Sequence, residues 1–215
     1  MSVGKVYALC LRLLVDTELA EKLTADAFLI VRRNIAFFRE DILFSSWITG
    51  ITIYTILDWL RNNGGLWNNP DEMKPGQVRR NLNGKIENAF EISIQSLPDK
   101  ERFVFILHDI EKYSVDEIAD LLAFTKENVK SILHKAYEQL VKRDIIADKK
   151  EYVRICLTTL PMIIQPEHDI WKNIFARLNS EHNPVTESQG EQLNVSENEE
   201  DKKKKKFGFL NWKKK

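Results

Sequence analysis

Residues 113–140 carry the pattern that most restricts the fold of this chain. Ser114 and Glu117 have the spacing of a capping box, in which the two residues satisfy free backbone N–H groups at the start of a helix. An apolar stripe at helical spacing follows and ends at Leu122, and Thr125 then provides a second N-cap. Two helices joined by so short a connection form a helix-turn-helix, and the sequence predicts one here.

The second of these helices has a polar and basic face opposite its apolar stripe. The stripe consists of Val129, Ile132, Leu133, Ala136 and Leu140. At about 100° per residue, the opposite face and its flanks hold Lys126, Glu127, Lys130, Ser131, His134 and Lys135. Such side chains suit the major groove of DNA, although a solvated face on an ordinary helical hairpin explains the same pattern.

The rest of the chain is also predicted to be all-α. Only 6 of the 215 residues are proline and 8 are glycine, and most of them lie between periodic apolar stretches. Residues 47–57 (WITGITIYTIL) are rich in β-branched side chains, so propensity alone favours a strand there. Residues 61–80 contain paired glycines, prolines and several asparagines, which is the composition of a linker. We therefore expect two small helical domains joined by a linker.

Charge and motif content exclude several classes of function. The formal net charge is zero, which argues against a protein that coats nucleic acid through bulk charge. The two cysteines and four histidines form no metal-binding motif, and no phosphate loop or nucleophile motif is present. We expect no metal, no cofactor, no catalytic residue and no enzymatic activity. The N-terminal apolar stretch is wrong for a secretory signal and residues 42–57 are too short to span a bilayer, so we expect a cytoplasmic protein.

Residues 97–140 resemble the C-terminal DNA-binding domain of sigma-70 factors of the extracytoplasmic-function (ECF) group. The family pattern runs LPxxxRxVFxLxxxExxSxxEIAxxLxxSxxxVKSxLxxAxxxL. This chain reads LPDKERFVFILHDIEKYSVDEIADLLAFTKENVKSILHKAYEQL, with Thr125 where serine is usual. The resemblance implies that this domain reads the −35 promoter element. The residues that it places against DNA are Lys126, Lys130, Ser131, His134 and Lys135.

Residues 11–48 resemble the first domain of the same family. Here LRLLVDTELAEKLTADAFLIVRRNIAFFREDILFSSWI follows the pattern LRLLGDxxxAEDLxQExFLxxWRNxxxFRxxxxFxxWL. The resemblance implies a helix that docks on RNA polymerase through Ala20, Glu21, Asp26 and Phe28. It implies contact with the opened −10 element through Phe38, Arg39, Phe44, Trp47 and Tyr54. The family has a helix where residues 47–57 lie, so we expect a helix there, and two of the aromatic residues, at 44 and 47, have an alternative role in the core.

The resemblance implies a sigma factor that directs bacterial RNA polymerase to specific promoters and initiates transcription. Its implied partners are core RNA polymerase, promoter DNA and an anti-sigma factor. Gly50, Ile53, Tyr54 and Trp59 stand where the family usually has basic and polar residues, which leaves fewer phosphate contacts. Two alternatives therefore stay open: a divergent helix-turn-helix regulator, and a module that binds polymerase or an anti-sigma factor without melting promoters.

We expect five segments along the chain. Residues 1–63 form the domain for polymerase docking and the −10 element, residues 64–84 the linker, and residues 85–145 the helix-turn-helix domain. Residues 146–180 form a C-terminal helical extension. Residues 181–215, acidic and then lysine-rich, form a disordered tail.

The extension carries an apolar stripe at helical spacing, formed by Ile170, Trp171, Ile174, Phe175 and Leu178. Residues 160–178 also resemble a short stretch found near the membrane in some anti-sigma proteins. Packing on the second domain is the simplest role for such a helix, and covering a surface needed for polymerase or DNA is the alternative. The lysine-rich tail is either solvated or in weak contact with a membrane surface or nucleic-acid phosphate.

Overall fold

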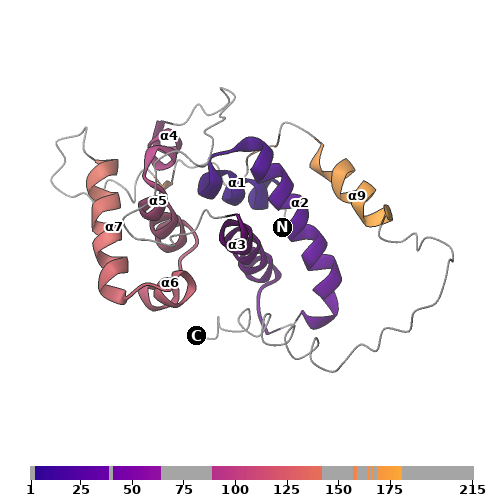
Figure 1. Cartoon of the computed structure of the whole chain (residues 1–215), viewed down its shortest axis with the longest axis horizontal. Helices are drawn as coiled ribbons and strands as arrows, with labels where there is room; N and C mark the ends of the chain where they lie inside the picture. The colour runs from indigo at the N-terminus through magenta and orange to yellow at the C-terminus, as the bar shows by residue number, and fades with distance from the viewer. Residues whose placement is uncertain are drawn as a thin grey trace.

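The computed structural model describes residues 3–38, 41–63, 89–141, 157–158, 164, 166 and 169–180. Every regular element in these residues is a helix (Figure 1), which confirms the all-α prediction. Arg39, the expected linker at 64–84 and the tail at 181–215 lie outside the described residues.

The first half of the molecule is built from three α-helices and one short turn. They are α1 (Val3–Leu14), α2 (Thr17–Asn34), the 3₁₀ turn η1 (Ile35–Phe37) and α3 (Phe44–Asn62). The side chain of Asp16 caps α2 by accepting a hydrogen bond from the Leu19 N–H at 2.8 Å. Aspartate is a favoured N-cap residue, because its side-chain oxygen satisfies a backbone N–H group that has no partner within the first turn.

Residues 47–57 lie within α3, although their propensity favours a strand. Ile51 and Ile56 are fully buried against the neighbouring helices, and this burial outweighs the modest helix penalty of β-branched residues. The Thr52 and Thr55 hydroxyls donate to carbonyl oxygens one turn earlier, at 2.8 Å each, so these buried polar groups have partners. The helix expected from the family resemblance is confirmed.

The second half is a smaller helical unit. It contains α4 (Ala89–Ser96), α5 (Asp99–Phe105) with its π-helical continuation η2 (Ile106–Ile110), α6 (Val115–Leu122) and α7 (Lys126–Leu140). Phe105, Ile118, Val129 and Ala136 are buried at its centre. Their positions place α6 and α7 on a common support formed by α5 and η2.

The two halves pack against each other and share one continuous hydrophobic core. A buried ion pair joins them: the Arg12 guanidinium of α1 lies 2.8 Å from the Glu91 carboxylate of α4, and the two side chains are 5% and 0% exposed. A second donor from Arg12 reaches both carboxylate oxygens at 3.0 Å. This fork-like geometry satisfies charges that would be costly to bury alone.

Arg102 forms a second connection between the halves. Its guanidinium donates to the Leu13 carbonyl at the end of α1, at 3.1 and 3.2 Å, and to the Leu97 carbonyl at 2.8 Å. It also pairs with Asp99. Since the side chain is 1% exposed, this family-matched arginine serves the fold by satisfying carbonyls at helix ends.

The C-terminal extension contributes helix α9 (Ile170–Ser180). Asp169 caps it by accepting from the Lys172 N–H at 3.1 Å. The helix packs on α2, at the end of the molecule opposite α7 (Figure 1), so the expectation that it packs on the second domain is wrong. The reason is that α2 offers both an apolar and an acidic partner to α9: Phe28 contacts Trp171, and Asp26 pairs with Arg177.

Chemically reactive features are few in the described part of the chain. None of its helices is long and apolar enough to cross a bilayer, and no cluster of three or more His, Cys, Asp or Glu side chains in it could hold a metal ion. Cys10 is fully buried, and burial raises its thiol pKa to about 12. The thiol therefore stays protonated and acts as a small core side chain.

Candidate nucleic-acid interface

The helix-turn-helix has the local structure that its sequence predicts. The Ser114 N–H donates to the Glu117 carboxylate at 2.6 Å, and the Glu117 N–H donates to Ser114 Oγ at 3.3 Å, which completes the capping box. Ala123 ends α6 in the left-handed conformation with φ 56°. Thr125 then caps α7 by accepting from the Asn128 N–H at 3.2 Å. These local signals fix the turn between the two helices.

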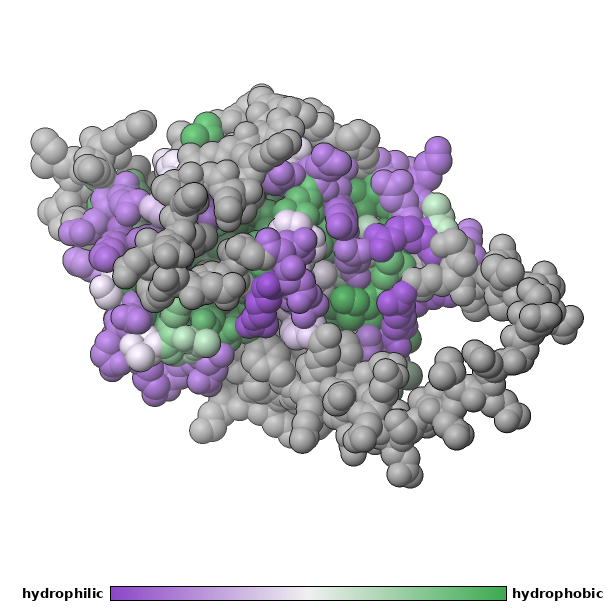
Figure 2. Space-filling view, viewed as in Figure 1, coloured by the Kyte–Doolittle hydropathy of each residue, from purple (hydrophilic) through white to green (hydrophobic). Residues whose placement is uncertain are grey.

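Helix α7 buries one face and exposes the other. Val129 and Ala136 are fully buried and Leu140 nearly so, whereas Ile132 and Leu133 of the predicted stripe are only half-buried. The side chains predicted to face DNA are all exposed: Lys126, Lys130, Ser131, His134 and Lys135. Hydrophilic side chains cover the outer edge of the molecule at α6 and α7 (left in Figure 2). Contact between this face and DNA stays a prediction.

Two contacts link α7 to the neighbouring elements. The Tyr137 hydroxyl donates to both carboxylate oxygens of Asp109 in η2, at 2.8 and 2.9 Å. Burial, and then the hydrogen bond to this carboxylate, raise the pKa of Tyr137 above its usual range, so the hydroxyl remains a donor at neutral pH. At the other end, Lys126 Nζ lies 2.8 Å from the Asp116 carboxylate of α6, but both side chains are more than half exposed, so this pair is weak. The Tyr137–Asp109 contact therefore does more to orient the exposed face, and it does not involve Lys130 or Lys135.

His134 lies beside a carboxylate on the same helix. Its Nε2 lies 3.6 Å from a carboxylate oxygen of Glu138, one turn later on α7. Both side chains are more than half exposed, so their interaction is weak. Lys126, Lys130 and Lys135 supply the positive charge of the exposed face.

Three of the residues expected at the −10 element form an aromatic cluster where η1 meets the start of α3. The rings of Phe38 and Phe44 are 5.2 Å apart, and the Trp47 ring lies 5.2 Å from Phe38 and 5.8 Å from Phe44. Phe44 is 39% exposed, whereas Trp47 is 6% exposed. The Phe44 ring is therefore partly open to solvent, whereas Trp47 is a core residue, which agrees with the alternative role given for Trp47 above.

The remaining −10 candidates are not brought into this cluster. Tyr54 is half-buried and lies ten residues beyond Phe44 on α3, about 15 Å along the helix axis. Arg39 lies outside the described residues.

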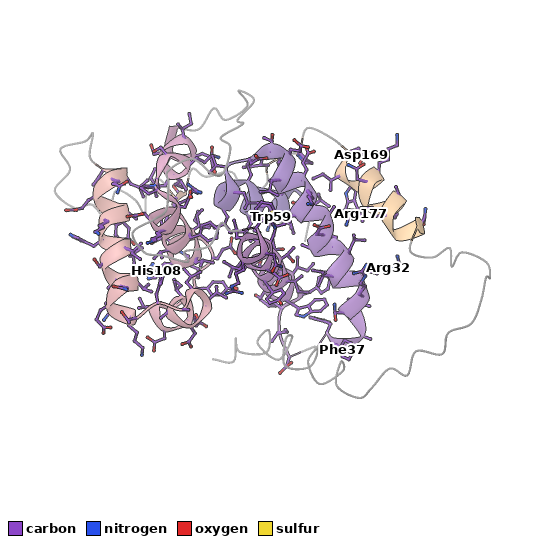
Figure 3. The ribbon with its side chains drawn as sticks, viewed as in Figure 1. Arg32, Phe37, Trp59, His108, Asp169 and Arg177 are labelled. Carbon is purple, nitrogen blue, oxygen red and sulfur yellow. The ribbon has the colours of Figure 1, made fainter. Side chains whose placement is uncertain are left out.

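Sequence reasoning missed two exposed apolar side chains beside the cluster. Phe37 is 69% exposed at the end of η1 (Figure 3), and Leu43 is 74% exposed just before α3. The adjacent pair Phe37–Phe38 was the available signal: neighbouring residues in a short turn point in different directions, so one of two consecutive aromatics is often exposed. Large exposed apolar groups at one place indicate a contact surface.

Helix α2 carries the residues expected to dock on polymerase. Ala20 is fully buried in the core, so this residue supports the helix and has no surface to offer a partner. Glu21, Asp26 and Phe28 are half-buried on the outer side of the same helix. The structure thus separates a core residue from three that border the surface.

Comparison with known proteins identifies both halves of the chain. Residues 2–65 match the family described as "Sigma-70 region 2", and residues 89–140 match "Sigma-70, region 4". Together the two matches cover more than half of the chain, in the order that the helical units follow. The chain belongs to the sigma-70 family of RNA polymerase sigma factors.

Relatives of this sigma factor include members of the ECF group. It is 27% identical over 154 residues to the ECF RNA polymerase sigma factor SigW of Bacillus subtilis, covering 65% of this chain and 82% of SigW. It is 27% identical over 151 residues to the ECF RNA polymerase sigma factor SigE of Mycolicibacterium smegmatis, covering 66% and 58%. A probable RNA polymerase sigma factor of Haemophilus influenzae is 27% identical over 148 residues, covering 58% and 76%. This sigma factor acts in promoter-specific transcription initiation and is not an enzyme.

A solved structure of the sigma factor RpoE in complex with the anti-sigma factor NepR, from Bartonella quintana, also matches this chain. The matched chain is 17% identical to this sigma factor, with a TM-score of 0.45, and the match covers 65% of this chain and 89% of that chain.

Proposed function

We propose that this sigma factor docks on core RNA polymerase through α2, reads the −35 element with α7 and holds bases of the opened −10 strand on the Phe38–Phe44–Trp47 cluster. The observation that carries this proposal is made on α7 of the helix-turn-helix. One face of α7 is polar, basic and exposed, and the opposite face is buried. Packing gives no reason for lysines on that face, whereas the major groove and its phosphates do.

The aromatic cluster supports the second part of the proposal. Single-stranded bases stack on exposed aromatic rings, and such stacking tolerates changes of base because every base has a π-face. Phe44 and Phe37 provide exposed rings at one place, on the half of the chain that matches region 2. The cluster therefore offers rings on which extruded bases of the −10 strand could stack.

Reading both elements at once requires the two halves to separate. Elements named for positions −10 and −35 lie about 25 base pairs apart, or about 85 Å at 3.4 Å per base pair. A compact chain of this length is only about 45 Å across. The shared core and the Arg12–Glu91 pair thus belong to a closed form, which we propose opens when the protein binds polymerase and promoter.

The proposed docking is tested by co-purification of the full chain with core polymerase. We expect a stable complex that forms without promoter DNA. A folded chain that fails to bind core polymerase would instead favour a regulator that uses the helix-turn-helix alone. An anti-sigma factor is a further partner in this proposal, as the family resemblance implies.

The α7 face gives a specific prediction. Lys130→Ala should weaken binding to −35 DNA several-fold and reduce the slope of log affinity against log salt by about one, because one phosphate contact is lost. Equilibrium binding measured across a salt series checks this. Lys5→Ala, which removes the same charge from an exposed position on α1, is the matched control and should leave both quantities unchanged. A folded Lys130→Ala protein with the original affinity and slope would exclude this face as the DNA reader.

A further inference from the structure

Helix α9 lies outside both family-matched segments, yet it packs on one of them. The matches end at residue 140, and α9 spans Ile170–Ser180. Its Ile170 and Ile174 side chains are each 2% exposed and join the core cluster of the molecule. The helix therefore packs at a defined position on the region 2 half of the molecule.

The surface that α9 covers is the expected polymerase-docking face of α2. Arg177 extends from α9 toward α2 (Figure 3), and its guanidinium lies 2.6 Å from the Asp26 carboxylate. The Trp171 ring lies 5.4 Å from the Phe28 ring. Two of the four residues assigned to polymerase docking are thus in contact with α9, and a third, Ala20, is buried in the core.

The contact has the features of a reversible cover. Trp171 and Phe175 of α9 remain 46% and 58% exposed, and the Arg177 side chain is 47% exposed, so only one narrow stripe of the helix is buried. An 11-residue helix is marginally stable by itself in water, which means that α9 depends on α2 for its order. Before α9, the backbone N–H of Ile164 donates to the Gly4 carbonyl at 3.2 Å, so Ile164 itself lies beside α1.

We propose that α9 competes with core RNA polymerase for the α2 face. This inference rests on the proposed docking role of α2. Polymerase and α9 cannot both contact Asp26 and Phe28, so polymerase binding must displace the helix. The extension then acts as a built-in antagonist that lowers the affinity of this sigma factor for polymerase in the absence of a releasing event.

The strength of the antagonism follows from the population of the covered state. Apparent affinity falls in proportion to the fraction of molecules in which α2 is uncovered. If about 90% of molecules are covered, release of α9 strengthens polymerase binding about tenfold. We expect an effect of at least this size, because two buried isoleucines, Ile170 and Ile174, and the Arg177–Asp26 ion pair hold α9 on the molecule.

The test introduces a charge into the buried contact between α9 and α2, in the full-length protein. Ile174→Asp buries a carboxylate against the core if α9 stays docked, so the helix should detach. Asn173→Asp adds the same charge to the neighbouring, exposed position and is the matched control. We expect Ile174→Asp to bind core polymerase about tenfold more tightly than the wild type. The control should bind within about twofold of the wild type.

Hydrogen–deuterium exchange of the α9 amides provides a second readout. In the free protein, Ile174→Asp should remove the protection of residues 170–180, and in the wild type, adding core polymerase should do the same. Equal or weaker polymerase binding by Ile174→Asp, with α9 detached, would overturn the competition while leaving the docking role of α2 intact. Failure of the wild type and both variants to bind polymerase would contradict the proposed function together with this inference.

Discussion

Replacing Arg12 with alanine should destabilise the closed form of this sigma factor by about 3–5 kcal/mol, because it leaves the Glu91 carboxylate buried without its charged partner. Glu91 is 0% exposed, and Arg12 binds its carboxylate through two donor nitrogens. A chain whose halves are able to separate escapes this cost by opening. The loss should therefore appear either as a lower unfolding midpoint in denaturant or as a larger radius of gyration by small-angle scattering.

The double variant Arg12→Met, Glu91→Met is the control for this prediction. It removes both charges and fills the same space with apolar side chains, so it should be much more stable than Arg12→Ala and closer to the wild type. An Arg12→Ala protein with an unchanged midpoint and an unchanged radius would show that the ion pair does not hold the two halves together.

Phe44→Ala should weaken binding to single-stranded −10 DNA about fivefold to 150-fold. One stacked aromatic ring contributes about 1–3 kcal/mol to single-strand binding, and Phe44 is the most exposed ring of the three that form the cluster. Association with core polymerase should stay unchanged, since Phe44 lies on α3 and not on α2. Fluorescence anisotropy with a labelled −10 oligonucleotide and the polymerase complex measures the change.

Leu43→Ala is the matched control for the aromatic cluster. Leu43 is even more exposed, at 74%, and is apolar, but it has no ring on which a base could stack. Its loss should change single-strand binding by less than about threefold. Equal effects of the two substitutions would show that the site uses general apolar contact, and no effect of Phe44→Ala would remove the cluster from the −10 site.

Features encoded by neighbouring residues could be predicted from the sequence. The capping box of Ser114 and Glu117 and the cap at Thr125 act over three residues, so they fixed the start of α6 and α7 correctly. The helix at residues 47–57 needed the family resemblance, because burial between helices, which single-residue propensity does not register, decides its structure.

Contacts between distant residues could not be predicted. Arg12 and Glu91 are 79 positions apart, and nothing in either local sequence marks them as partners. The apolar stripe on α9 predicted that this helix packs on an apolar surface but did not identify that surface. Packing on α2, and not on the second domain, depends on Asp26 and Phe28 being available together. Exposure is equally hard to predict. Phe44 and Trp47 are both large aromatic residues that match the family pattern, but Trp47 is buried and Phe44 is exposed.

The most direct test of the central claim is run-off transcription with core RNA polymerase, the full-length protein and a pool of promoter fragments. The account predicts transcripts that require this sigma factor and that start downstream of fragments sharing a −35 and a −10 sequence. It further predicts that Lys130→Ala and Phe44→Ala reduce these transcripts while leaving polymerase binding unchanged. Transcription no higher than that of core polymerase alone, from a folded protein that binds polymerase, would contradict it.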